Sequence, residues 1–245
     1  MKYGPASFWL IVDGYNLTAM RLKQFSWVTE SITEQVTGLG DAAEVHAPVN
    51  MLRTEISQSG GFFDDATNQA HEALAPYLPS GPSAAHRILA FGVEGMEAGK
   101  RFVGCAGVYS HAYEVMAGRG ELVKANAQYR VSGHTDRGVI LQPLATKTAD
   151  WNTEDAPFDS GAGSNDGGVG YLFVTACSGF TNFVAKIRDS SDGVTFADLI
   201  EFNDDVQAPY AQRVEVAGTV DRYLAFEGNV TGSGSITAMA GFSRR

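Results

Sequence analysis

Residues 21–37 read RLKQFSWVTESITEQVT, and this stretch decides the fold. Phe25, Trp27, Ile32 and Val36 alternate in part with polar residues, while its threonines, valines and isoleucine favour a strand over a helix. We therefore expect one very long strand here, or two strands that bend. Because such a strand exceeds what a small sandwich needs, part of it is expected to project from the body.

The segments on either side of this stretch also have the pattern of strands. Residues 8–18, FWLIVDGYNLT, form an apolar run that is interrupted by Asp13-Gly14. Residues 38–50 carry no periodicity and are predicted to be a mobile loop. Further strands are expected over 51–57, 86–93, 100–115, 121–133 and 137–141.

One short helix is expected between the strands that end near residue 63 and begin near residue 86. Asp64 or Asp65 can cap it, and Pro76 ends it. Its apolar side is formed by Ala66, Ala70, Ala73 and Leu74. A helix this short must rely on packing against a sheet.

Residues 150–168, DWNTEDAPFDSGAGSNDGG, are the best domain boundary, because they are rich in Gly, Ser and Asp. They are predicted to be a linker or an exposed extended arm between a domain over 1–149 and a C-terminal domain over 169–245. In the latter, Asp192-Gly193 is a strong hairpin signal, and Gly218-Thr219 is expected to play the same role. Strands spaced by about ten residues, the rhythm of a sandwich, are expected over 169–176, 180–189, 194–202, 211–217, 220–227 and 234–242.

The predicted fold class is therefore mainly β. It combines an antiparallel β-sandwich or barrel carrying one short helix with a C-terminal β-sandwich domain.

The charge of the chain argues against a protein whose main task is to grip a phosphate backbone. The net charge is −10, whereas phosphate binding requires clustered Lys and Arg. Residues 1–150 hold 12 Lys and Arg against 15 Asp and Glu, a net of −3, and residues 151–245 hold 6 against 13, a net of −7.

Signals for catalysis are weak, and we predict no catalytic residues, no cofactor and no enzyme activity. Ser164 lies in a glycine-rich string, but this string is in the expected linker and not between a strand and a helix. Glu94 and Glu97 could be the paired carboxylates of a glycosidase, yet they lie in a turn between strands, where acidic residues are common.

No metal site is predicted either. Asp189, Asp192 and Asp198 could be calcium ligands, but their spacing does not fit an EF-hand. Cys105 and Cys177 are expected to be reduced thiols. No pair among the histidines has the i, i+4 spacing of a helical zinc site, namely His46, His71, His86, His111 and His134.

No stretch approaches the roughly 18 apolar residues that a membrane-spanning helix needs. The N-terminal MKYGPASFWLIVDGYNL lacks a small-residue cleavage site and is interpreted as a first strand, not a signal peptide. The chain is therefore expected to be made in the cytoplasm and to have no membrane partner.

The order of these elements resembles the tail tube fold of phage major tail proteins. The resembling features are Gly4-Pro5 before the first strand, the long stretch 21–37, the strand that opens MLRTEISQSGGFFDD at residue 51, one helix, and long strands that end at GVIL (138–141). The final segment 211–244 looks like the ending of phage structural proteins, and an outer β-domain is common in this family.

This resemblance implies a virion protein of a phage tail, made in the host cytoplasm, with no catalytic residues. Its subunits would form rings, usually hexameric, that stack into a tube through which DNA passes without sequence-specific binding. The implied partners are further copies of the chain and other tail proteins such as terminator, tape measure and distal tail proteins. Glu30, Glu34 and Glu55 are candidates for acids that face the lumen.

Two other functions remain open at this stage. One is a different virion component, such as a capsid decoration protein or a head–tail terminator. The other is a glycan-binding adhesin module that rests on the C-terminal domain. Phe25 and Trp27 share one face of the long strand, where they would pack in the core or against a neighbouring subunit.

Overall fold

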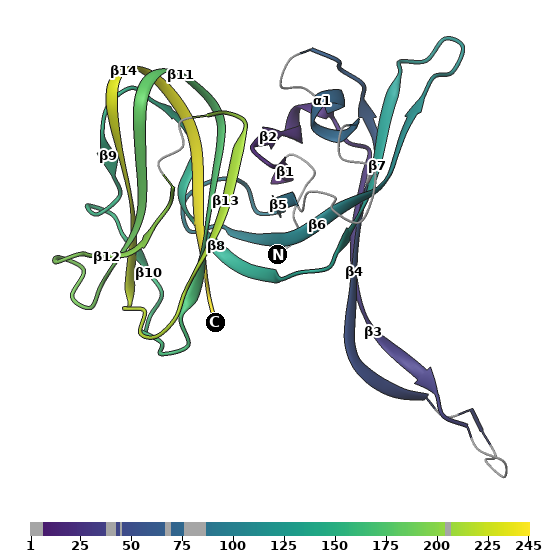
Figure 1. Cartoon of the computed structure of the whole chain (residues 1–245), viewed down its shortest axis with the longest axis horizontal. Coiled ribbons are helices and arrows are strands. Elements are labelled where there is room, and N and C mark those ends of the chain that lie inside the picture. Colours follow the sequence, from purple (N-terminus) through teal and green to yellow (C-terminus); the bar gives the residue numbers. More distant parts are fainter. Residues whose placement is uncertain (1–6, 38–42, 45, 67–69, 76–86, 204–206) are drawn as a thin grey trace.

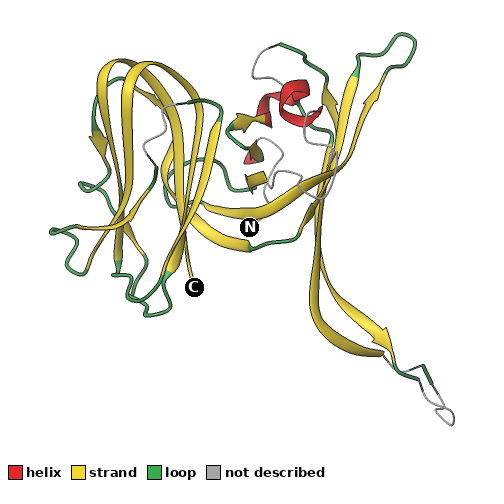
Figure 2. Ribbon diagram, viewed as in Figure 1, coloured by secondary structure: helices red, strands yellow, loops and turns green. Residues whose placement is uncertain are grey.

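The computed structural model describes residues 7–37, 43–44, 46–66, 70–75, 87–203 and 207–245. These residues form one large antiparallel sheet with one short α-helix (Figures 1 and 2), which confirms the prediction of a mainly β chain. The sheet is folded into two lobes, which we call the N-terminal lobe (described residues up to Lys147) and the C-terminal lobe (from Trp151 onward).

The N-terminal lobe is organised around the strand order β3-β4-β7-β6, and β6 also pairs with β5 and β8. Strand β5 pairs in turn with β1, and β1 with β2. The element bounds are β1 (Trp9–Val12), β2 (Tyr15–Asn16), η2 (a 3-10 helix, Leu17–Met20), β3 (Gln24–Gln35), β4 (His46–Phe62), α1 (Ala70–Leu74), β5 (Arg87–Gly92), β6 (Arg101–Met116), β7 (Lys124–Val131) and β8 (Thr135–Lys147).

The expected helix is present as α1, and its apolar side packs into the core of the N-terminal lobe. Ala70, Ala73 and Leu74 are buried in a cluster with β1, β5, β6 and β7. The prediction is wrong for Ala66, which lies in a bend before α1 and is exposed. Of the two candidate caps, Asp64 makes the local contacts: its Oδ1 accepts a hydrogen bond from the backbone N–H of Ala66 at 3.0 Å, and its carbonyl accepts one from His71 N–H at 2.8 Å. Pro76 lies outside the described residues.

Strands β3 and β4 form a long hairpin whose far end leaves the lobe. Strand β4 pairs with β7 only from Thr54 onward, so its first part has β3 as its sole partner. We call the part of this hairpin beyond β7, residues 30–37 and 46–53, the arm. It extends away from both lobes (Figure 1), as expected for part of this stretch.

The prediction of a loop over 38–50 is wrong for residues 46–50, which belong to β4. Residues 46–48 pair with the end of β3, and the register shifts over residues 49–51. The sequence HAPVN has no alternation, and its pairing with β3 makes it part of the strand. Residues 38–42 and 45 lie outside the described part of the chain.

The C-terminal lobe is a sandwich made largely from two long strands that bend. The bounds are β9 (Trp151–Asn152), β10 (Phe158–Asp159), β11 (Gly168–Ser190), β12 (Ala197–Glu201), β13 (Tyr210–Val216) and β14 (Tyr223–Arg244). β11 pairs with β14 along its whole length, and the two halves of β11 face each other: Gly170 lies against the side chains of Ile187, Ile200 and Phe202. One pair of strands therefore contributes to both layers.

The sequence predicted each of these long strands as two separate ones. The prediction is wrong because the glycines near the middle form bulges and do not end the strand. The register between β11 and β14 shifts around Phe180, and Gly179 and Gly232 adopt φ of +78° and +102°. Bulges bend a strand while its pairing continues.

The turn at Gly218-Thr219 does not connect a hairpin as predicted. Strand β13 pairs with β11, and β14 pairs with β11 along its other edge, so the chain crosses from one side of β11 to the other over residues 217–222. By contrast, Asp192-Gly193 does join the paired strands β11 and β12, which confirms that hairpin.

Residues 150–168 lie along β14. The short strands β9 and β10 both pair with it, and Ser160 N–H donates to the carbonyl of Arg222 at 3.1 Å. This segment, which is rich in Gly, Ser and Asp, is thus tied to the C-terminal lobe by backbone hydrogen bonds. The division into domains at 149 and 168 stays a prediction.

The two lobes are joined through β8 and a buried polar cluster. β8 pairs with β6 at its start and with β14 at its end, so one sheet runs through both lobes. The Tyr171 hydroxyl on β11 donates to Asp136 on β8, and Arg213 on β13 donates from Nε to the same carboxylate at 2.9 Å. Burial raises the pKa of Tyr171, so its hydroxyl remains a donor at any ordinary pH.

Candidate assembly surface

The outer edge of β3 is the first candidate for a binding surface. Within the described part of the chain, β3 pairs with β4 alone, so its other edge is unpaired over Gln24–Gln35. This edge contains no Lys and no Pro, the residues that natural proteins place on edges to prevent unwanted strand pairing. An edge of this length can therefore accept a strand from another chain.

The buried face of the β3–β4 hairpin continues outward onto the arm. Ile56, Thr54 and Leu52 lie on one face of β4 because side chains alternate along a strand. The exposed fraction rises along this row from 1% at Ile56 and 6% at Thr54 to 72% at Leu52. A core-like face thus extends into solvent where β7 ends.

Phe25 and Trp27 occupy the root of the hairpin, where they pack within their own lobe. The ring centroid of Phe91 lies 4.7 Å from that of Phe25 and 5.6 Å from that of Trp27. Of the two expected roles for this pair, core packing is the one that these contacts support.

The opposite face of the hairpin is charge-balanced. Two of the candidate lumen acids form ion pairs, Glu30 with Arg53 at 3.3 Å and Glu55 with Arg130 at 3.4 Å. Glu34 has no ion pair among the described residues. That these acids face a lumen stays a prediction, and only Glu34 would bring an uncompensated negative charge to it.

The tip of the β6–β7 hairpin is a second exposed apolar patch, at the other end of the same sheet (Figure 1). Sequence reasoning did not single it out, although two apolar pairs flank its glycine turn. The exposed side chains are Val115, Met116, Leu122 and Val123.

A groove of about 530 Å³ lies where the two lobes meet, and we call it the inter-lobe groove. Its walls are mainly aromatic and aliphatic, with three arginines and one acid among its charged residues. Sequence reasoning missed it because its residues come from strands that are distant in the sequence. They include Trp27, Phe91, Val93, Phe102, Phe158, Leu224 and Phe242, together with Glu94, Arg101, Arg137 and Arg244.

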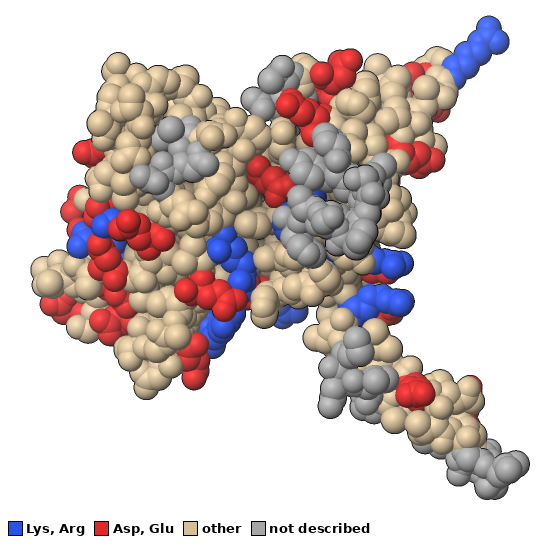
Figure 3. Space-filling model, viewed as in Figure 1, with Lys and Arg blue, Asp and Glu red and all other residues tan. Residues whose placement is uncertain are grey.

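Arg137 stacks over the face of Trp27 with its guanidinium carbon 5.4 Å from the ring centroid. Neither Arg101 nor Arg137 forms an ion pair among the described residues. Arg244 is held instead by the backbone carbonyls of Val220, at 2.8 Å, and Asp221. The groove is therefore apolar with an excess of positive charge. In the view of Figure 3, Lys and Arg side chains lie between the two lobes with Asp and Glu side chains beside them.

The three aspartates considered as calcium ligands each have a separate role. Asp189 accepts a hydrogen bond from the backbone N–H of Asp221 at 2.8 Å, and Asp198 forms an ion pair with Lys186 at 2.7 Å. Asp192 accepts backbone hydrogen bonds from Val194 and Thr195, both at 2.9 Å, in the β11–β12 turn. Within the described ranges, no cluster of His, Cys, Asp or Glu could hold a metal ion.

We expect the Asp192→Ala variant to lose stability at neutral pH, with the loss shrinking in acid. Hydrogen bonds from Thr195 and Val194 lower the pKa of Asp192 from 3.8 to about 2. Since the folded-state pKa is depressed, this stabilisation is complete above pH 4 and is lost as the pH falls through about 2. Thermal melts of both proteins between pH 7 and pH 2 measure this, and a difference in melting temperature independent of pH would contradict it.

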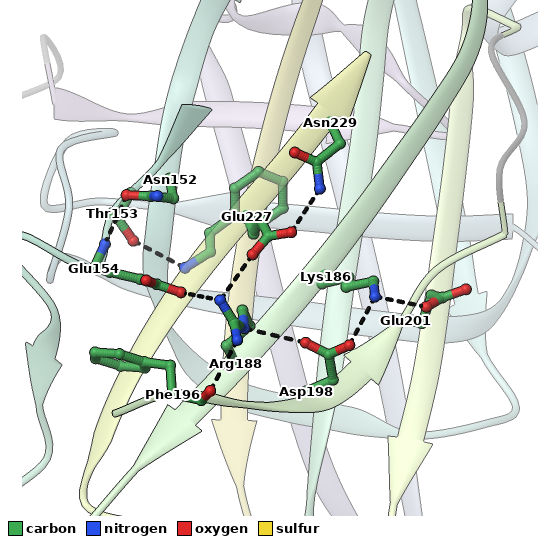
Figure 4. A network of polar contacts seen from close by, with 11 residues as sticks. Asn152, Thr153, Glu154, Lys186, Arg188, Phe196, Asp198, Glu201, Glu227 and Asn229 are labelled. Atoms are coloured by element: carbon green, nitrogen blue, oxygen red, sulfur yellow. Dashed lines mark hydrogen bonds and ion pairs between the residues drawn. The ribbon is translucent and has the colours of Figure 1, made fainter. Parts of the chain in front are cut away.

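Close to this turn, Arg188 connects several elements of the C-terminal lobe (Figure 4). Its guanidinium contacts Glu154, Glu227 at 2.9 Å and Asp198 at 3.1 Å, and it donates to the carbonyl of Phe196 at 2.8 Å. These contacts tie the segment that contains Glu154 to β11, β12 and β14. Each of these contacts joins one element of the lobe to another, so we assign the network a structural role.

The other residues considered for chemistry are also dispersed. Ser164 bridges to Val220 and accepts from Arg244 at 3.3 Å, whereas Glu94 accepts from the backbone N–H of Arg101 at 3.3 Å. Burial raises the pKa of the Cys105 thiol to about 12, which makes it a poor nucleophile.

The histidines do not come together either. His71 contacts the Tyr113 hydroxyl at 2.8 Å, His46 lies 3.7 Å from Glu44, His134 lies 3.9 Å from Glu215, and His111 lines a small cavity at the root of the arm. His86 lies outside the described residues.

No helix in the described ranges is long and apolar enough to cross a membrane.

No family model and no curated protein matches the chain. Among solved structures, it is similar to a chain of the virion of a native gene transfer agent particle, at 12% identity and a TM-score of 0.41, over 55% of this chain and 97% of the other. It is also similar to the SPP1 Dit protein, described as a paradigm of the hub adsorption apparatus of phages that infect Gram-positive hosts, at 12% identity and a TM-score of 0.33, over 97% and 99% of the two chains. A third is a chain of the phage p2 baseplate, at 9% identity and a TM-score of 0.31, over 94% and 97%. The chain thus has a distant structural similarity to chains of a gene transfer agent virion, of a phage hub adsorption apparatus and of a phage baseplate.

Proposed function

We propose that this chain is a structural subunit of a phage-like tail, which works by assembling with copies of itself. The arm is the observation that carries this proposal. A monomer gains nothing from a hairpin that leaves its own core, because the ordered residues there cost conformational entropy without burying apolar surface. A neighbouring subunit can supply the missing burial.

The exposed features of the arm match that role. Leu52 is 72% exposed on the continuation of a core face, and full burial of such a side chain stabilises a contact by roughly 1.5–3 kcal/mol. The free edge of β3 can pair with a strand of a second copy, and a ring of such contacts leaves no edge unpaired.

In the finer form of the proposal, the chain is the tail tube subunit. Residues 1–149 form rings, which we expect to be hexameric and to stack into a channel for DNA, while residues 169–245 lie on the outside. Its location is then the virion, and its partners are the terminator, tape measure and distal tail proteins. The resemblance in element order supports this form.

Negative-stain electron microscopy of the purified protein, first dilute and then concentrated, tests the proposal. Stacked rings with an open channel are the expected result. Closed trimers or solitary rings that do not stack would contradict the tube and favour a decoration or terminator protein. Particles that stay monomeric at every concentration would contradict self-assembly, and glycan binding by such monomers would favour an adhesin.

A further inference from the structure

We infer that the inter-lobe groove is the receptor for the arm of a second copy of this chain. This inference rests on the proposed function, because it takes self-assembly as given and names the two surfaces that meet. Ligand grooves are typically lined by apolar and aromatic side chains with a few placed polar groups. The inter-lobe groove has this composition and a volume of about 530 Å³.

The arm and the groove are complementary in both polarity and charge. The groove offers aromatic walls beside Arg101 and Arg137, neither of which has an ion-pair partner among the described residues. The arm offers Leu52, 72% exposed, on one face and Glu34, which likewise lacks an ion-pair partner there, on the other face, and Val36 just beyond β3 is 51% exposed. An acidic side chain is visible on the arm in Figure 3. Within the described residues, the groove thus has arginines without an acidic partner, and the arm has an acid without a basic partner. Both surfaces also have apolar side chains that a contact between them would bury.

An arm cannot occupy the groove of its own chain. Trp27 lines the groove at the root of the hairpin, and β3 runs from there without interruption to Gln35. At about 3.3 Å per residue, Glu34 lies roughly 23 Å farther along the strand. Figure 1 shows the arm pointing away from both lobes, so an arm that fills the groove must come from a second copy.

A contact between the arm of one copy and the groove of the next joins two different surfaces. Every copy then donates an arm and receives one, and such head-to-tail contacts close into a ring or continue as a helix. Trp27 lines the groove, and its indole Nε1 has no hydrogen-bond partner among the described residues. Its ring also supports Arg137, which places this cation at the groove.

Two sets of full-length variants test the inference. The arm variant is Leu52→Asp combined with Glu34→Arg, and the groove variant is Arg101→Glu combined with Arg137→Glu. Each is expected to weaken self-association by about 100-fold, the equivalent of about 2.8 kcal/mol at 1.4 kcal/mol per factor of ten. The matched controls change residues elsewhere: Val194→Asp, at an 82% exposed turn residue, and Lys147→Glu, at the half-buried last residue of β8. Sedimentation velocity of each protein measures the association.

Mixing the two variants gives the decisive result. An arm variant keeps a working groove and a groove variant keeps a working arm, so together they should form a 1:1 dimer that cannot grow. Native mass spectrometry should find twice the 26.1 kDa mass of the chain. The dimer also shows that both variants are folded. As a second measurement, Glu34→Arg and Arg137→Glu should each weaken association alone and restore it when combined in one chain.

The outcomes separate the inference from the proposed function. Rings formed by the groove variant would overturn the inference and leave the tail function intact. A mixture that stays monomeric, or that grows into rings, would overturn it as well. A wild-type protein that never associates would overturn both.

Discussion

Replacing Arg87 by methionine is expected to destabilise the N-terminal lobe by about 3–5 kcal/mol, the usual cost of removing one partner from a buried ion pair. The Arg87 side chain is fully buried, and its Nε lies 2.6 Å from Oδ2 of Asp13. Methionine fills a similar volume but leaves the carboxylate without its cation. Chemical denaturation followed by near-ultraviolet circular dichroism measures the loss.

The same side chain also stabilises the only α-helix of the described structure. Arg87 Nη2 donates to the carbonyl of Ala73, in the last turn of α1, and Nη1 lies 3.4 Å from the Ser110 hydroxyl. Carbonyls at the end of a helix have no partner within the helix and must find one elsewhere. We therefore expect α1, which has five residues, to lose its order before the strands do.

The matched control is Arg53→Met on the arm, whose partner Glu30 lies 3.3 Å away and is about half exposed. Exposed pairs contribute less than about 1 kcal/mol, so this variant should remain close to the wild type. If both variants lose the same free energy of unfolding, burial of the ion pair is not what makes Arg87 important for stability. Asp13→Asn combined with Arg87→Met should recover part of the loss, because no unpaired charge then remains.

How far the sequence predicts this fold depends on how local the signals are. The alternation in residues 21–37 predicts β3, and Asp192-Gly193 predicts a turn, because the residues concerned determine both locally. Glycines near Phe180 have the same local signature as a turn, but pairing between β11 and β14 continues through them as bulges. Whether a glycine ends a strand or bends it depends on the partner strand, which local sequence does not specify.

The same reasoning applies to the candidate site. Leu52 belongs to a run that alternates correctly, yet its exposure follows from the end of β7 at Val131, which is remote in the sequence. The inter-lobe groove brings together Trp27, Phe158 and Phe242 from three separate regions of the chain. No pattern within one segment could have indicated that these rings line the same groove.

Replacing Gly14 by alanine is expected to cost about 3 kcal/mol and to act on the contact between the lobes. Gly14 has a φ of +87°, where an L-residue costs roughly 1–2 kcal/mol. A Cβ there would lie 2.3 Å from the backbone N of Tyr210 and 2.6 Å from the carbonyl O of Val174, both in the C-terminal lobe. Backbone atoms in paired strands cannot move aside individually, so overpacking adds roughly 1–3 kcal/mol.

Gly218→Ala separates the clash from the backbone strain. Gly218 has a φ of +91°, close to that of Gly14, but a Cβ there would meet nothing within 4 Å. Gly218→Ala should therefore lower the melting temperature only by the amount that the backbone strain costs. Gly14→Ala should lower it by roughly 6–12 °C in total. The excess at Gly14 then measures how tightly the β1–β2 turn is held against β11 and β13. If both variants melt at the same temperature, the lobes can shift apart at this point without cost, and the turn does not hold them together.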